Sequence, residues 1–167
     1  MARKYAYQSG AEQVGKSRLD NAQVSYKKTY GVCRAITGMK VERALEYLDN
    51  VVAHQEIVPI FKFHGGASRH AQANSWGINS GRWPEKSVRL VRNLLVQAAA
   101  HAKALHQVEK ETLVVKSTFC GLSGQINHRR NYRAHGRVNG YNSEPCHVQI
   151  ICSPSTEKVA VAKDLKQ

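Results

Sequence analysis

The chain has 167 residues and a formal net charge of +13, because 25 Lys and Arg residues outnumber 12 Asp and Glu residues. This length suits one domain, and this charge favours a polyanionic partner, either nucleic acid or an anionic membrane surface. The sequence has no apolar run near the roughly 20 residues of a membrane span, and its polar start lacks the apolar block of a secretory signal. We therefore expect a cytoplasmic protein with no membrane span.

The first 28 residues are polar and basic, and Gly10 and Gly15 interrupt any helix there. Such a composition favours an extended segment that lies on a partner, although a solvated tail has the same composition. We predict a basic N-terminal arm over residues 1–28 and a single globular domain over residues 29–167.

Helical periodicity begins at Thr29, a candidate N-cap for a short helix that Gly38 ends. Apolar residues at three- and four-residue spacing predict a second helix over about 40–54. The longest helix is predicted over about 84–106, where Pro84 suits a first helical position.

Residues 60–83 form a long connection that is rich in glycine, basic and aromatic residues. A loop of this length is usually functional or contains a short helix, for which 68–76 is the candidate. Trp76 and Trp83 suit either of two roles, stacking on bases or covering the core.

Alternating apolar residues predict strands over 113–119 and 146–152. The stretch from Thr112 to Ser143 contains no Asp or Glu, and Gly136 and Gly140 can form a turn. We predict a long β-hairpin over about 117–146, whose arms of roughly fifteen residues would reach about 50 Å. An isolated hairpin of that length is marginal in water, so a partner must hold it.

The acid-free stretch contains four arginines with histidines and tyrosines between them. Arginine matches phosphate oxygens with its planar fork, and planar side chains stack on unpaired bases. The sequence therefore predicts RNA binding, with phosphate contacts from Arg129, Arg130, Arg133 and Arg137. His135 is a candidate for contact with a base.

Four cysteines occur without a Cys-x-x-Cys pair, which favours small buried hydrophobic residues in a reducing compartment. A zinc site at Cys146 and His147 is disfavoured, because adjacent strand residues face opposite ways.

Enzyme signatures are absent from the sequence, although His54, His64 and His70 could meet around the long loop. We expect no enzymatic activity, cofactor or metal. A general nucleic-acid-binding or chromatin protein remains open on charge alone.

Several specific sequence blocks distinguish between these functional classes. Ala-Ile-Thr-Gly-Met-Lys-Val-Glu-Arg-Ala-Leu-Glu-Tyr-Leu spans 35–48, Val-Pro-Ile-Phe-Lys-Phe-His-Gly-Gly spans 58–66, and Gly-Arg-Trp-Pro-Glu-Lys-Ser spans 81–87. Tyr-Arg-Ala-His-Gly-Arg-Val at 132–138 precedes Ser-Glu-Pro-Cys-His-Val at 143–148. With these blocks, residues from about 16 to 151 resemble the universal large-subunit ribosomal protein family called L twenty-two in bacteria and L seventeen in eukaryotes.

The resemblance implies an α+β fold with a small three-stranded antiparallel sheet packed on helices and one long protruding β-hairpin. It implies large-subunit ribosomal RNA and neighbouring ribosomal proteins as partners, transient contact with the nascent peptide, and no homo-oligomer. It places the tunnel tip at Arg133, Ala134, His135, Gly136 and Arg137. The expected RNA-binding residues are Lys16, Arg18, Lys27, Lys28, Lys62, Arg69, Arg82, Trp83, Lys86, Arg129, Arg130, Arg133 and Arg137. For Lys62, Arg69, Arg82 and Lys86, a solvated surface position is an equal alternative. One departure lies at 121–127, where the family usually has a proline and a methionine before the basic run.

Overall fold

A computed structural model describes residues 5–7, 14–124 and 127–155. Its main helices are α1 (Tyr26–Ile36), α2 (Val41–Val52) and α3 (Glu85–His106), with the 3₁₀ turns η1 (Ala71–Trp76) and η2 (Lys110–Thr112). Its strands are β1 (Gly15–Ala22), β2 (Val58–Pro59), β3 (Gly81–Arg82), β4 (Leu113–Leu122), β5 (Arg130–Tyr132), β6 (Val138–Gly140) and β7 (Cys146–Pro154).

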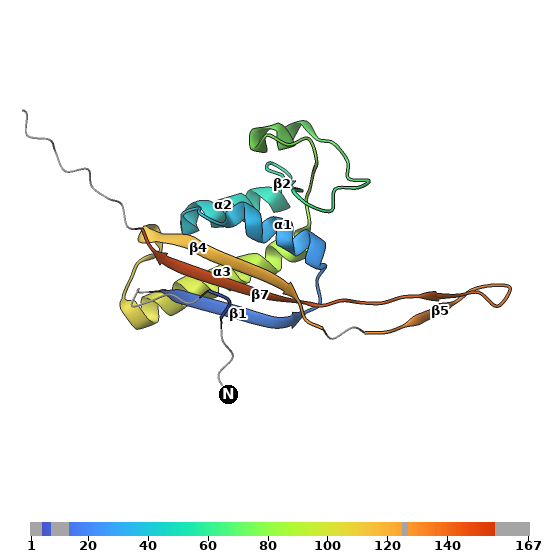
Figure 1. Cartoon of the computed structure of the whole chain (residues 1–167). Helices are drawn as coiled ribbons and strands as arrows, with labels where there is room; N and C mark the ends of the chain where they lie inside the picture. The colour runs from blue at the N-terminus through green and yellow to red at the C-terminus, as the bar shows by residue number, and fades with distance from the viewer. Residues whose placement is uncertain (1–4, 8–13, 125–126, 156–167) are drawn as a thin grey trace, which may run out of the picture.

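A three-stranded antiparallel sheet in the order β1-β7-β4 forms the centre of the fold. The helix α3 packs along β1 and β7, and α1 packs along β4 (Figure 1). The central strand β7 is buried over nearly its whole length, as expected for a strand with a neighbour on each side. The predicted α+β fold, with a small sheet packed on helices, is confirmed.

The strand β1 contradicts the predicted N-terminal arm, because residues 15–22 pair with β7 instead of lying apart. Gly15 does not serve as a helix breaker. Its actual role is close packing, since a Cβ atom there would lie 2.2 Å from the carbonyl oxygen of Ala98 and 2.8 Å from the Cβ of Ala102. Of the remaining arm, residues 1–4 and 8–13 lie outside the described residues. The amide of Ala6 donates to Gln149 Oε1 at 2.8 Å, which holds residues 5–7 against β7.

The first helix begins before its predicted cap. Ser25 is the N-cap, and Thr29 is buried inside α1. The Thr29 hydroxyl donates to the Ser25 carbonyl at 2.9 Å and lies 3.1 Å from Ser87 Oγ. The N-cap prediction was wrong because a threonine hydroxyl can also bond the carbonyl one turn back inside a helix. The other two helices agree with prediction to within two residues at either end.

The core closes around the Tyr47 side chain, which is fully buried and donates its hydroxyl to the Ile57 carbonyl at 2.9 Å. Burial, with a smaller effect of the Glu56 charge, raises the pKa of Tyr47, so the phenol stays a donor. Trp76 packs edge-on against it with ring centroids 5.8 Å apart. Both tryptophans are partly buried and pack against the core, as the core-covering interpretation predicts.

Trp83 lies between two histidines, His54 at 4.9 Å and His70 at 4.7 Å between ring centroids. Two of the three loop histidines, His54 and His70, therefore come together, but the indole ring of Trp83 lies between them. The third, His64, is exposed.

The cysteines are free thiols, three of them buried and Cys120 half-buried. Contact with Cys146 lowers the pKa of Cys120, but contact with Cys33 and burial outweigh it and bring that pKa to about 12. Burial raises the pKa of Cys152 to about 12 as well. Protonated thiols are poor metal ligands and nucleophiles, which supports their interpretation as core residues.

Within the described residues, no helix is long and apolar enough to cross a membrane.

Candidate nucleic-acid interface

A long β-hairpin projects from one end of the sheet (Figure 1). Its antiparallel ladder runs from the Asn127–Ser143 bridge to the pair of Tyr132 with Val138. The turn lies at 133–137, where the amide of Arg133 donates to the carbonyl of Arg137 at 2.8 Å. His135 and Gly136 both have left-handed backbone angles, with φ of 59° and 67°. The hairpin tip is therefore at the predicted residues, with Gly136 in the turn and Gly140 in β6.

The hairpin is exposed along its length. Every residue from Asn127 to Glu144 is exposed, and the side chains of Tyr132 and Tyr141 are 74% and 66% exposed. A contact at its root joins Ser143 Oγ to Gln23 Oε1 at 3.3 Å. Since a two-stranded ribbon has little stability of its own, this surface needs an external partner to hold its shape.

The register divides the arginines between the two faces of the ribbon, because side chains alternate along a strand. Arg129, Arg133 and Arg137 share one face, and Arg130 shares the other with Tyr132. Among the described residues, none of these four arginines forms an ion pair. Both faces therefore present uncompensated positive charge.

The two arms of the hairpin differ in length near its root. The amide of Ser123 bonds to the Pro145 carbonyl, and the next pairing joins Asn127 to Ser143. Between these two pairings the first arm therefore has three residues in sequence, 124–126, and the second arm has one, Glu144. This unequal count falls inside 121–127, where the sequence departs from the family pattern. Residues 125 and 126 lie outside the described residues.

A second basic cluster lies on the globular part, where four of the predicted RNA-binding residues line one pocket of about 260 Å³. These are Lys27, Lys28, Lys62 and Arg82. Sequence reasoning missed the aromatic rings that line the pocket with them, Tyr30, Phe61 and Phe63. The alternation Phe-Lys-Phe at 61–63 was an available signal, but only the fold brings Tyr30 beside it.

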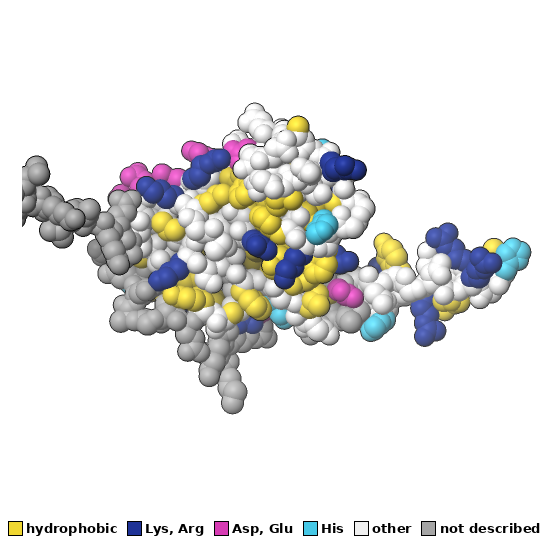
Figure 2. Space-filling view, turned by 45° about the horizontal axis from the view of Figure 1, so that its top comes forward, with side chains coloured by type: hydrophobic (Ala, Val, Ile, Leu, Met, Phe, Trp, Pro, Cys, Tyr) yellow, Lys and Arg dark blue, Asp and Glu magenta, His cyan; other side chains and the backbone are white. Residues whose placement is uncertain are grey.

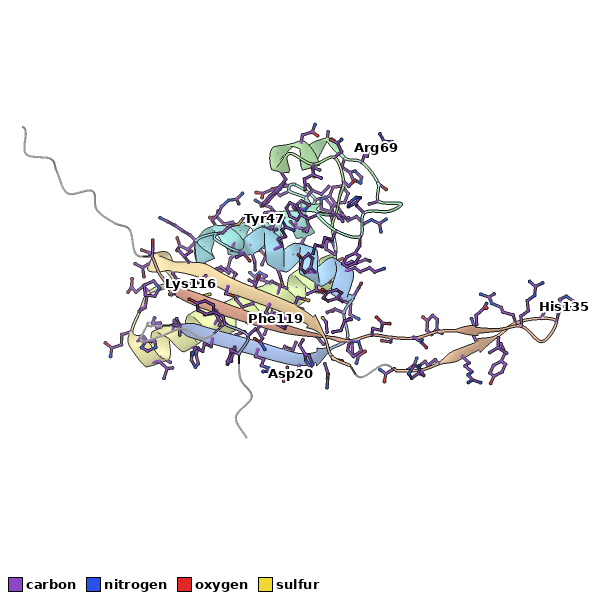
Figure 3. The ribbon with its side chains drawn as sticks, in the orientation of Figure 1. Asp20, Tyr47, Arg69, Lys116, Phe119 and His135 are labelled. Carbon is purple, nitrogen blue, oxygen red and sulfur yellow. The ribbon has the colours of Figure 1, made fainter. Side chains whose placement is uncertain are left out.

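The remaining predicted contact residues line neither this pocket nor the hairpin. Lys16 lies over the Tyr5 ring, with its ammonium 5.9 Å from the centroid, and Arg18 forms a 2.7 Å ion pair with Asp20. Arg69 and Lys86 are exposed on the long loop and on α3. Trp83 is half-buried between its two histidines. Figure 3 shows how widely these regions are separated, with Arg69 on the loop, Asp20 on the sheet and His135 at the hairpin tip.

Acidic side chains gather elsewhere, along the exposed face of α2 at Glu42, Glu46 and Asp49. Asp49 is paired with a local arginine, through the two-point contact of Arg92 at 2.7 and 3.1 Å. The hydrogen bond to Asp49 raises the pKa of Arg92. Figure 2 shows most of the acidic side chains in view gathered at one side of the globular part, with basic ones among them, and basic side chains along the hairpin.

The described residues contain no group of three or more His, Cys, Asp or Glu side chains that could hold a metal ion. Cys146 and His147 do not converge on one site, since Cys146 is buried in the core and His147 Nδ1 lies 3.0 Å from Asp20.

Comparison with known sequences shows which protein family the chain belongs to. The family described as Ribosomal protein L22p/L17e matches residues 17–153. The chain belongs to this family. It is 41% identical over 145 residues to the large ribosomal subunit protein uL22 of Argas monolakensis, covering 87% of this chain and 77% of that protein. It is 39% identical over 142 residues to uL22 of Yarrowia lipolytica, with 85% and 76% covered. With uL22 of Debaryomyces hansenii the identity is 35% over 167 residues, with 100% and 89% covered. The family is one of structural ribosomal proteins and not of enzymes, in agreement with the sequence-based expectation.

Proposed function

We propose that this protein is a structural component of the large subunit of cytoplasmic ribosomes, where it binds large-subunit ribosomal RNA chiefly through the hairpin. The observation that carries this proposal is a ribbon with four arginines and no acidic residue between Asn127 and Ser143, exposed throughout. The large-subunit names of its relatives support the same assignment.

The arrangement of charge suggests how the hairpin binds. Phosphate neutralisation supplies affinity without sequence preference, and the shape of folded RNA supplies the site. Because Arg129 and Arg133 lie on one face and Arg130 on the other, the ribbon is suited to insertion between two RNA segments. RNA packed on both faces would replace the hydrophobic layer that a free hairpin lacks.

The tip has a separate role in this proposal. Residues Arg133 to Arg137 lie beyond the last paired strand position and form the wall of the nascent-peptide exit tunnel, where they contact the growing chain in passing. The support is the narrow, exposed turn at the end of the projection together with the family relationship. Lys16, Arg18, Arg69, Trp83 and Lys86 are proposed as peripheral RNA contacts. The acidic face of α2 is proposed to point away from RNA, toward solvent or neighbouring ribosomal proteins.

Sedimentation of a tagged copy from cell lysate through sucrose gradients at low and high salt tests this function. Co-migration with large subunits that survives high salt is expected. A position at the top of the gradient would contradict the proposal.

A general nucleic-acid-binding protein would share the charge, so a second measurement separates the two functions. The purified protein should bind large-subunit RNA in preference to duplex DNA at equal salt. Equal affinity for both would favour the general role.

A further inference from the structure

The pocket lined by Lys27, Lys28, Lys62 and Arg82 is a distinct hollow on the globular part. It lies between the start of α1 and the loop that follows β2, and its inner wall includes Gly31, Val58 and Pro59. A Cβ atom at Gly31 would come within 3.4 Å of the Pro59 carbonyl oxygen, so the helix and the loop meet closely there. The result is a small hollow with an apolar floor and basic side chains at its rim.

Aromatic rings line this hollow, and each lies close to a cation. The Lys27 ammonium lies 5.5 Å from the Phe63 ring centroid, and the Lys62 ammonium lies 5.8 Å from that of Tyr30. The Arg34 guanidinium lies 4.3 Å from the centroid of Phe61. Phe63 is also half exposed, at 52%. These rings combine a flat apolar surface with adjacent positive charge.

The backbone of Phe63 is strained. Its φ is 60°, in the left-handed region that bulky side chains rarely adopt. Such strain persists where the surrounding structure imposes it, and it is concentrated at binding sites. Here it holds a half-exposed ring, which also packs edge-on against Tyr26 with centroids 6.2 Å apart, at the mouth of a pocket where a ligand could cover it.

The lining defines the chemistry of that ligand. The four cations at the rim suit a phosphate, the first turn of α1 contains no acidic residue, and the pocket lining itself contains none. The apolar floor and the rings suit a flat heterocycle. We propose that this pocket binds one unstacked nucleotide of single-stranded RNA, with its base against Phe63 and Tyr30 and its phosphate near Lys27, Lys28 and Arg82. This inference rests on the proposed function, since it assigns a specific contact within RNA binding.

A second hollow suggests the path of the strand. It lies at the root of the hairpin and is lined by Leu122, Tyr141 and Ser143, together with Lys27 and Phe63. Phe63 thus stands between the nucleotide pocket and the hairpin. An RNA strand that follows the hairpin toward the globular part would pass over this ring and could insert one base beside it. Figure 2 shows hydrophobic and basic side chains together on the globular surface near this root.

The test compares Phe63→Ala with Phe119→Ala in the full chain. Phe119 is a matched control, because it is 44% exposed on β4 and lines neither hollow. The probes are a short fluorescent oligouridylate and an RNA duplex of equal charge. Because one base–aromatic stack is worth about 1–3 kcal/mol, Phe63→Ala should weaken oligouridylate binding at least about fivefold. Phe119→Ala should leave it unchanged, and neither variant should alter duplex binding.

A crosslinking measurement on the unmodified protein tests the same contact even if Phe63→Ala disturbs the loop that contains Phe63. An oligonucleotide with 4-thiouridine should crosslink to peptides that contain Tyr30 or Phe63 in the unmodified protein. Equal oligouridylate binding by both variants, or crosslinks confined to the hairpin, would overturn the proposal. Neither result would affect co-sedimentation with large subunits, so this inference and the proposed function can fail separately.

Discussion

The backbone amide of Arg133 donates to the carbonyl of Arg137 at 2.8 Å, and this bond closes the tip of the hairpin. It joins two residues that face each other across the ribbon, so both guanidinium groups emerge on the same side. The three residues between them complete the turn, with left-handed angles at His135 and Gly136. Two like charges are thus held close together at the end of an exposed projection. Such an arrangement is favourable only when an anionic partner compensates it.

Reversing charge on both faces of the ribbon should prevent assembly. The double change Arg130→Glu and Arg133→Glu replaces phosphate attraction with repulsion on each side. We expect the variant to be absent from mature large subunits, measured by quantitative blotting of gradient fractions. The matched control is Arg43→Glu with Arg89→Glu, which makes the same charge change at exposed ion pairs on the globular part, where such pairs contribute little. Normal amounts of the hairpin variant in subunits would contradict the proposed role.

Hydrogen exchange should divide the free protein into two regions. The amides of β7 and α3 are buried and should exchange slowly, whereas those of β5 and β6 should exchange almost at the rate of an unfolded peptide. Mass spectrometry of the isolated protein measures both at once. Equal protection in the two regions would mean that the hairpin is stable without RNA.

The close approach of β1 to α3 predicts a specific sensitivity at Gly15. Adding a methyl group there creates contacts of 2.2 and 2.8 Å with Ala98 and Ala102, so Gly15→Ala should lower the free energy of unfolding by about 1–3 kcal/mol or more. Gly65→Ala is the control, because a Cβ at Gly65 meets no atom within 4 Å. Urea denaturation measures both variants. A neutral Gly15→Ala would indicate that β1 is not docked against α3 in solution.

The buried thiol of Cys152 predicts alkaline destabilisation. Burial raises its pKa from 9.0 to about 12, so between these values the unfolded chain releases the proton while the native protein keeps it. The unfolded state then binds fewer protons, and the free energy of unfolding falls as pH rises from about 9 to 12. Urea denaturation as a function of pH should give a shallower decline for Cys152→Ala than for the unmodified protein. Other groups that titrate in this range are common to both proteins and cancel in the comparison. Identical slopes would contradict the buried position of the thiol.

The helices and the hairpin could be predicted because their signals are local. The periodicity of α2 and α3 is set by residues three and four apart, and the basic run at 128–137 has no acid to compensate it. The strand β1 could not be predicted in the same way. Its core-facing residues Gly15 and Ser17 are small, and at Gly15 the backbone of α3 lies directly against the strand, so the usual apolar alternation is missing.

Local patterns in the sequence predicted the helices, the long strands and the hairpin turn, whereas the α+β fold as a whole followed from the resemblance to the family. The excess of basic residues predicted a polyanionic partner, which stays a prediction. The three-dimensional structure was needed to show that residues 15–22 complete the sheet, that Trp83 lies between His54 and His70, and that Lys27, Lys62 and Arg82 meet around one aromatic pocket. These features depend on contacts between segments that are far apart in sequence. Which distant segments meet is fixed by packing of the whole core, and no local pattern of residues encodes it.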